Sequence, residues 1–182
     1  MRNIEIKARV ADLAPLRERI MALGAAASES LQQTDTFFHV PRGRMKLREF
    51  GDGSAELIYY ERPDEPEPKL SRYLRAPCPD PSSLCLLLRE ALEVRGIVKK
   101  RRELFRLGQT RVHLDDVDGL GNFVELEVVL EENQSVSHGQ RVARDLMARI
   151  GLEGQELVAT AYIDLLERLK VNAGSVLGCD TA

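Results

Sequence analysis

Four short segments of this chain alternate charged and apolar residues at every second position. They span residues 4–10, 44–48, 111–115 and 124–128, and the alternation is clearest in Val124-Glu125-Leu126-Glu127-Val128. Because successive side chains of a β-strand point to opposite faces of the sheet, each segment presents charged groups on one face and aliphatic groups on the other. Taken singly, each strand is typical of an antiparallel sheet with one face in water.

The charged faces of these strands predict a binding site when they are taken together as one surface. We expect one shared face to hold nine cations and four anions, namely Lys7, Arg9, Arg44, Lys46, Arg48, Arg62, Lys100, Arg102 and Arg111 with Glu5, Asp115, Glu125 and Glu127. So many cations on one face repel one another unless an anion lies among them. In a chain whose net charge is −3, this predicts a locally positive site for an anion, with carboxylates nearby that suit a divalent metal.

The length and composition of the chain predict one domain. With 182 residues, of which 43% are apolar and 30% charged, the chain can build one good hydrophobic core and is small for two. We therefore assign residues 1–170 to a single domain and residues 171–182 to a disordered C-terminal tail.

Composition also limits the cellular setting and the partners. No segment approaches the roughly 18 to 20 apolar residues needed to cross a membrane, and residues 1–3 lead straight into a strand pattern without a signal peptide. We expect a soluble, cytoplasmic protein that binds no membrane, and the lack of a separate run of Lys and Arg argues against nucleic acid. The three cysteines have neither metal nor redox spacing and are interpreted as reduced, structural thiols.

Eight strand patterns and four helical patterns predict an α+β fold. The strand patterns cover residues 2–10, 31–40, 44–50, 55–62, 69–76, 97–107, 110–116 and 122–131, and the helical patterns cover about residues 12–24, 81–92, 137–150 and 155–169. Eight antiparallel strands whose charged faces converge fit a closed β-barrel with a charged interior, because closure removes the exposed edges and leaves room for a small ligand. Helices would then cover the barrel from outside and pack against its apolar face.

Two glutamates on one strand are the clearest candidates for metal ligands. Glu125 and Glu127 lie two positions apart and therefore share a face; with Glu5 and Asp115 they would form an all-oxygen cluster that suits Mg²⁺ or Mn²⁺ rather than zinc. The alternative is that the two glutamates form salt bridges with Lys or Arg across the sheet. His113 lies on the same charged face, where a single histidine is more often a hydrogen-bonded neighbour than a ligand.

Several segments of the chain resemble the CYTH superfamily, the triphosphate tunnel metalloenzymes. The segment Ile4-Glu5-Ile6-Lys7 is similar to the E-x-E-x-K signature of that family, although Asn3 stands where the first glutamate would be. Further segments in the family's order are residues 34–38, 44–48 and 57–63, the Lys100-x-Arg102 pair, and residues 111–115 and 121–127. The resemblance covers residues 1–169, and residues 111–127 are most similar to the class IV adenylyl cyclase branch.

The resemblance implies a tunnel that binds a linear triphosphate through Lys and Arg and a divalent metal through carboxylates. The substrate-binding residues would be Lys7, Arg9, Lys46, Arg48, Arg62, Lys100, Arg102 and Arg111. The ligands of Mg²⁺ or Mn²⁺ would be Glu5, Asp115, Glu125 and Glu127, and the catalytic residues would be Lys7 and Asp115. Asn3 would weaken the metal site, since a neutral amide oxygen binds a hard cation less strongly than a carboxylate does.

Three functions remain open at this point. The first is a class IV adenylyl cyclase, which would convert ATP to cyclic AMP and pyrophosphate. The second is a triphosphatase for thiamine triphosphate or inorganic tripolyphosphate, in which water attacks and no nucleobase pocket is needed. The third is a non-catalytic module that binds polyphosphate, which the missing carboxylate at position 3 would suit. In each case the partner is a small-molecule triphosphate, and a homodimer is one expected assembly.

Overall fold

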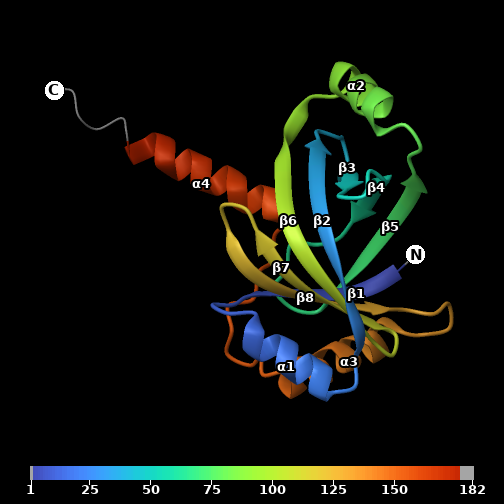
Figure 1. Cartoon of the computed structure of the whole chain (residues 1–182), viewed down its shortest axis with the longest axis vertical. Coiled ribbons are helices and arrows are strands. Elements are labelled where there is room, and N and C mark those ends of the chain that lie inside the picture. The colour runs from blue at the N-terminus through green and yellow to red at the C-terminus, as the bar shows by residue number, and fades with distance from the viewer. Residues whose placement is uncertain (1, 177–182) are drawn as a thin grey trace.

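Eight antiparallel strands form a closed barrel in the computed structural model, which describes residues 2–176, without the side chains of residues 27, 28 and 172–176 (Figure 1). The strands are β1 (Arg2–Arg9), β2 (Ala26–Phe38), β3 (Arg44–Phe50), β4 (Ala55–Glu61), β5 (Lys69–Pro77), β6 (Val94–Leu107), β7 (Thr110–Val117) and β8 (Gly121–Val129). Their order around the barrel is β1-β5-β4-β3-β2-β6-β7-β8, and β8 pairs with β1 to close it. The predicted closed eight-stranded antiparallel barrel is confirmed.

Within the described residues, four helices lie outside the barrel. They are α1 (Ala14–Ala22), α2 (Pro81–Ala91), α3 (Val136–Arg149) and α4 (Tyr162–Val176). Figure 1 shows α1 and α3 together beneath one end of the barrel, α2 over the opposite end, and α4 extending away from the wall. Among residues 2–176, no helix has the length and apolar character needed to cross a membrane.

Most of the hydrophobic core lies between the barrel wall and these helices, although Phe37 and Val98 of one cluster also line the barrel interior. Ile6, Val112 and Leu126 project outward and pack with Ile20 of α1 and with Ile150, which follows the last residue of α3. Smaller clusters place the start of α3 on β1, α2 on β3, and the first turn of α4 on β6 and β8. The apolar half of each alternating strand therefore faces the helices, as predicted, and its charged half is left to face inward.

A close approach of α3 to the barrel depends on a glycine. A Cβ atom placed on Gly139 would lie 2.6 Å from the Cγ1 atom of Ile4 and 2.7 Å from the Cδ2 atom of Leu130. Only a residue without a side chain fits at this contact, so Gly139 fixes how closely α3 covers the outer face of β1 and β8.

The helix boundaries differ from the predicted ones in ways that local hydrogen bonds explain. Helix α3 begins one residue earlier than predicted because the Ser135 hydroxyl accepts a hydrogen bond from the backbone of His138. The side chain of Gln140, in the first turns of this helix, donates to the carbonyl of Pro68. Helix α4 begins at Tyr162, not near residue 155, and it continues to Val176.

The C-terminal end of the chain changes one expectation. We expected a disordered tail from residue 171, but residues 171–176 belong to helix α4, so that part of the expectation is wrong. The remaining residues 177–182 lie outside the described part of the chain.

Candidate functional site

The interior of the barrel encloses a polar cavity of roughly 210 Å³ to which all eight strands contribute. Ten of the residues predicted for the site line this cavity: Glu5, Lys7, Lys46, Arg48, Arg62, Lys100, Arg102, Arg111, Glu125 and Glu127. The alternating pattern therefore brings together side chains that are more than 100 positions apart in the sequence. Arg9 and Asp115, which were also predicted for the site, do not line the cavity, and neither does Arg44, which was predicted for the same face and pairs with Asp64 and Asp164.

One wall of the cavity carries a cationic cluster built around Asp35. The Asp35 carboxylate is buried and accepts hydrogen bonds from Lys46 Nζ at 2.8 Å, from Arg48 Nε and Nη2 at 2.7 Å each, and from Lys100 Nζ at 3.4 Å. Burial alone would raise the pKa of Asp35, but Arg48, Lys46 and Lys100 outweigh it and hold that pKa well below its usual value. Asp35 therefore remains an anion that gathers three cations.

The two lysines of this cluster have too little negative charge nearby to keep their usual pKa values. Burial, reinforced by the nearby Arg48, lowers the pKa of Lys46 to about 8. Burial also lowers the pKa of Lys100 well below its usual value, although Asp35 acts in the opposite direction. One carboxylate thus does not compensate for the loss of water around three cations, and a second, larger anion in the cavity would stabilise their charged forms.

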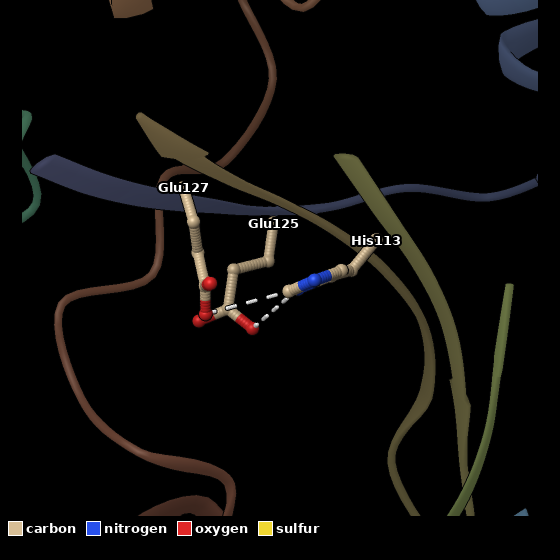
Figure 2. A group of neighbouring side chains, drawn as sticks. All are labelled: His113, Glu125 and Glu127. Atoms are coloured by element: carbon tan, nitrogen blue, oxygen red, sulfur yellow. Dashed lines mark ion pairs between the residues drawn. The ribbon is translucent and has the colours of Figure 1, made fainter. Parts of the chain in front are cut away.

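The facing wall carries His113 on β7 with Glu125 and Glu127 on β8 (Figure 2). One ligand atom from each residue lies within 4.8 Å of the other two. His113 Nδ1 is 3.7 Å from Glu125 Oε2 and 3.9 Å from Glu127 Oε1. Arg102 and Arg111 hold the two carboxylates by ion pairs of 2.9 and 2.8 Å, so the salt bridges expected as the alternative to metal binding are present. We call these three residues, His113, Glu125 and Glu127, the acidic pole.

Glu5 lies next to this pole because β1 pairs with β8, and its register partner is Glu127. Burial raises the pKa of Glu5; Arg62, 4.0 Å away, lowers it, and Glu125 and Glu127 raise it further. Burial alone would also raise the pKa of Glu125 and Glu127, but Lys7, His113 and Arg102 outweigh it at Glu125, and His113 and Arg111 outweigh it at Glu127. Both carboxylates therefore stay ionised and able to bind a divalent cation beside Glu5. Oxygen ligands with one imidazole fit Mg²⁺ or Mn²⁺ and match no all-sulfur or multi-histidine zinc site.

Several buried polar atoms of the cavity make no hydrogen bond to any described residue. They are Asn3 Oδ1, Gln33 Oε1, Arg62 Nε, Arg111 Nε and His113 Nδ1. Buried polar groups in folded proteins nearly always have partners, and all five of these residues line the same cavity. The cavity is therefore prepared for a polar ligand that contacts several walls at once.

Asp115 occupies a different place from the predicted one. Its carboxylate is completely buried and is held by Arg102 Nε and Nη2 at 2.6 Å each and by the Tyr162 hydroxyl at 2.8 Å. Burial opposes its ionisation, but Arg102 dominates and lowers the pKa of Asp115 to about 2. Asp115 and Arg102 are register partners on β7 and β6, so this pairing follows from the strand alignment. The Asp115 carboxylate therefore fixes Arg102 in this structure, and its metal-ligand and catalytic roles stay predictions.

Arg9 lies at the rim of the barrel and not in the cavity. It is the last residue of β1, its guanidinium lies 4.6 Å from the centre of the Phe123 ring, and its Nη1 atom donates to the carbonyl of Leu120 at 2.6 Å. The alternation of β1 assigns the correct face to Arg9, but the strand ends there and the side chain emerges beside the β7–β8 turn.

The segment before α4 supplies residues that the sequence patterns did not reveal. The backbone of Val158 donates to the carbonyl of Lys7 at 2.8 Å, and the carbonyls of Ala159 and Thr160 accept from Lys69 at 2.9 Å and from Lys7 at 3.3 Å. Tyr162 then places its ring 4.0 Å from Lys7 Nζ. This contact holds Lys7 in the cavity, and no strand pattern could have predicted it because it comes from the start of a helix.

The family model of the CYTH domain matches residues 1–162, which is most of the chain. The chain belongs to the CYTH family. Adenylate cyclase CyaB from Aeromonas hydrophila is 24% identical over 184 residues, which cover 96% of this CYTH protein and 94% of that one. The predicted family is thereby confirmed, and an enzyme that acts on triphosphates is supported.

Solved structures show the same fold. PH1012 from Pyrococcus horikoshii OT3 superposes with a TM-score of 0.82 at 26% identity, covering 90% of this CYTH protein and 98% of that chain. A Vibrio parahaemolyticus protein described as a candidate adenylate cyclase superposes with a TM-score of 0.74 at 20% identity, covering 91% and 97% of the two chains. CYTH proteins depend in general on a divalent metal, and the acidic pole with Glu5 fits one.

Proposed function

We propose that this CYTH protein is a metal-dependent enzyme that binds ATP by its triphosphate inside the barrel and converts it to cyclic AMP and pyrophosphate. The observation that carries the proposal is the division of one cavity into a cationic wall around Asp35 and an acidic pole. A metal–triphosphate complex has the complementary division of charge. The choice of cyclisation is supported by the similarity to an adenylate cyclase along almost the whole chain.

The cationic wall would bind the phosphates. A triphosphate carries about four negative charges, and arginine guanidinium groups match pairs of phosphate oxygens while lysines act as point charges. Arg48 and Arg102 present such groups, and Asp35 and Asp115 hold them by two hydrogen bonds each. Because these side chains are already fixed, little conformational entropy is lost when the phosphates bind.

The acidic pole would hold the metal beside the reacting phosphate, next to Glu5 on the neighbouring strand. Bound Mg²⁺ or Mn²⁺ supplies Lewis-acid chemistry, polarising the phosphoryl oxygens and activating the attacking hydroxyl. Glu5 is the carboxylate we assign to accept the proton of the ribose 3′-hydroxyl. The 3′-oxygen then bonds to the α-phosphorus, and the bond from that phosphorus to the bridging oxygen of the β-phosphate breaks.

Lys7 is the residue we assign to the charge that develops in this step. Its ammonium group is held by Tyr162 and Thr160 and lies on the strand that also carries Glu5. Burial lowers the pKa of Lys7, and Glu125 partly restores it, so that a developing phosphoryl anion would favour its charged form. Asp115 is a positioning residue in this scheme because it acts through Arg102.

The size of the cavity favours a second candidate, a triphosphatase. Roughly 210 Å³ is less than the range of about 300 to 1,000 Å³ typical of pockets that enclose an organic ligand. An inorganic triphosphate needs less room than a nucleotide, and water would replace the ribose hydroxyl as the attacking group. In this version the same cations and carboxylates act on the terminal phosphorus.

Product analysis separates the candidates. The purified protein is incubated with ATP, thiamine triphosphate or tripolyphosphate, each with Mg²⁺ or Mn²⁺, and the products are separated by ion-exchange chromatography. Cyclic AMP and pyrophosphate in equal amounts would support the cyclase, and orthophosphate from tripolyphosphate would support the triphosphatase. Binding without any product would leave a polyphosphate-binding module, and failure to bind any of the three would overturn the proposal.

A further inference from the structure

We propose that His113 is a nitrogen ligand of the metal and that it makes the acidic pole select Mn²⁺ over Mg²⁺. This inference rests on the proposed metal-dependent function and names the metal of that site. It starts from the imidazole itself, which is 4% exposed, lines the cavity and makes no hydrogen bond through Nδ1 to any described residue. A histidine that served only packing would be expected to have a partner at such depth.

The spacing of the three ligand atoms fits one small cation. Metal–ligand bonds of about 2.1 Å place neighbouring ligand atoms about 3.0 Å apart and opposite ones about 4.2 Å apart. The distances from His113 Nδ1 to Glu125 Oε2 and Glu127 Oε1, 3.7 and 3.9 Å, lie between these limits. Figure 2 shows the three side chains converging from two adjacent strands, so a common centre requires only small rotations.

The two glutamates are fixed so that they keep atoms directed at this centre. Arg111 pairs with Oε2 of Glu127, which leaves Oε1 of that carboxylate directed at the imidazole. Arg102 donates to Oε2 of Glu125, the oxygen that also faces His113 Nδ1, and because Arg102 also holds Asp115 it fixes the position of that oxygen. Partners of this kind orient metal ligands and strongly influence metal affinity.

The imidazole decides which metal the site prefers. Carboxylate and water ligands serve Mg²⁺ and Mn²⁺ alike, whereas a nitrogen ligand adds affinity for transition metals and little for Mg²⁺. Asn3, whose Oδ1 atom also lacks a partner among the described residues, lines the same cavity at the position where the family signature has a carboxylate. With one carboxylate fewer, the nitrogen of His113 contributes a larger share of the binding.

The first test is pulsed electron paramagnetic resonance of the wild-type protein with Mn²⁺ alone. Directly bound imidazole nitrogen gives a ¹⁴N coupling, which we expect to see in the wild type and in the control variant His39→Ala, whose side chain is exposed. The coupling should be lost in His113→Ala. Mn²⁺ that binds the wild type without a ¹⁴N coupling would overturn the inference even if every variant failed to fold.

The second test is the ratio of the two metal affinities, measured by Mn²⁺ titration and by Mg²⁺ competition without any anion. We expect His113→Ala to weaken Mn²⁺ binding by about tenfold or more and Mg²⁺ binding by less than about threefold. An unchanged ratio in His113→Ala would contradict the inference, but tripolyphosphate binding and turnover would still support the proposed function. A wild type that binds neither metal nor tripolyphosphate would overturn both.

Discussion

Removing the charge of Asp35 should weaken the fold and strengthen anion binding at the same time. Asp35 is the common partner of Lys46, Arg48 and Lys100, and its side chain is almost completely buried. Breaking a buried ion pair by removing one partner typically costs about 3 to 5 kcal/mol. For a chain of this length, Asp35→Asn should therefore lower the melting temperature by about 6 to 20 °C.

The same substitution should increase the stabilisation by tripolyphosphate. In the wild type, the incoming anion competes with the Asp35 carboxylate for the three cations, and in Asp35→Asn that competitor is gone. The rise in melting temperature on adding tripolyphosphate should therefore be larger in the variant than in the wild type. Thermal unfolding followed by circular dichroism, with and without the anion, measures both effects on the same samples.

The dependence of stability on pH gives an independent check. The folded-state pKa of Asp35 is depressed, so its contribution is fully present above the unfolded pKa of about 3.9 and is lost as the pH falls through the folded value. Asp35→Asn should lack this part of the acid sensitivity. The control is Asp116→Asn, because Asp116 forms an exposed pair with Arg101 and its removal should cost at most about 1 kcal/mol.

Two results would refute this reasoning. An Asp35→Asn protein that is as stable as Asp116→Asn would show that the buried cations do not need this anion. A smaller tripolyphosphate shift than in the wild type would show that Asp35 assists anion binding instead of competing with it.

Further substitutions test the remaining parts of the site. Glu127→Gln should abolish Mn²⁺-dependent turnover while leaving the far-ultraviolet circular dichroism unchanged, and retained activity would remove Glu127 from the metal ligands. Tripolyphosphate should raise the melting temperature of the wild type, and Arg48→Ala and Arg102→Ala should each reduce that rise relative to their own ligand-free values; a melting temperature indifferent to the anion would contradict the triphosphate assignment. Asn3→Glu should raise the turnover rate at subsaturating metal, with a gain that shrinks as the metal concentration increases, and a lower rate at every concentration would show that position 3 is no weakened ligand position.

The barrel and most of the cavity could be predicted because strand alternation is a local property of the sequence. The period of two in β1, β7 and β8 assigns Glu5, Glu125 and Glu127 to one face without any knowledge of the partner strands. The same period explains why Tyr60 lines the cavity and Tyr59 does not, since neighbouring side chains on a strand point in opposite directions.

The alternation of charged and apolar residues could not show how deeply a side chain is buried or with which charged group it forms an ion pair. Arg9 and Asp115 were assigned to the correct face, but one lies at the rim and the other is buried behind Arg102. Asp35 was missed as a central anion because its neighbours on β2 are threonines, so no charge alternation marks that strand. Residues 33–38 of β2 are mostly buried and carry no other charge, so the single carboxylate among them is the signal that could have found it.

The cations of the cavity are paired with the protein's own carboxylates, and this pairing affects which anions can bind in the barrel. Arg48, Arg102 and Arg111 each already have an internal counterion, so an entering anion must displace or supplement a carboxylate that the fold holds in place. Orthophosphate, sulfate or a single carboxylate contacts too few cations at once to compensate for that displacement. Only a ligand that spans several cations and brings its own metal satisfies both walls together. We therefore expect these ion pairs to make the barrel bind orthophosphate or sulfate weakly and to favour a polyvalent anion that carries a metal.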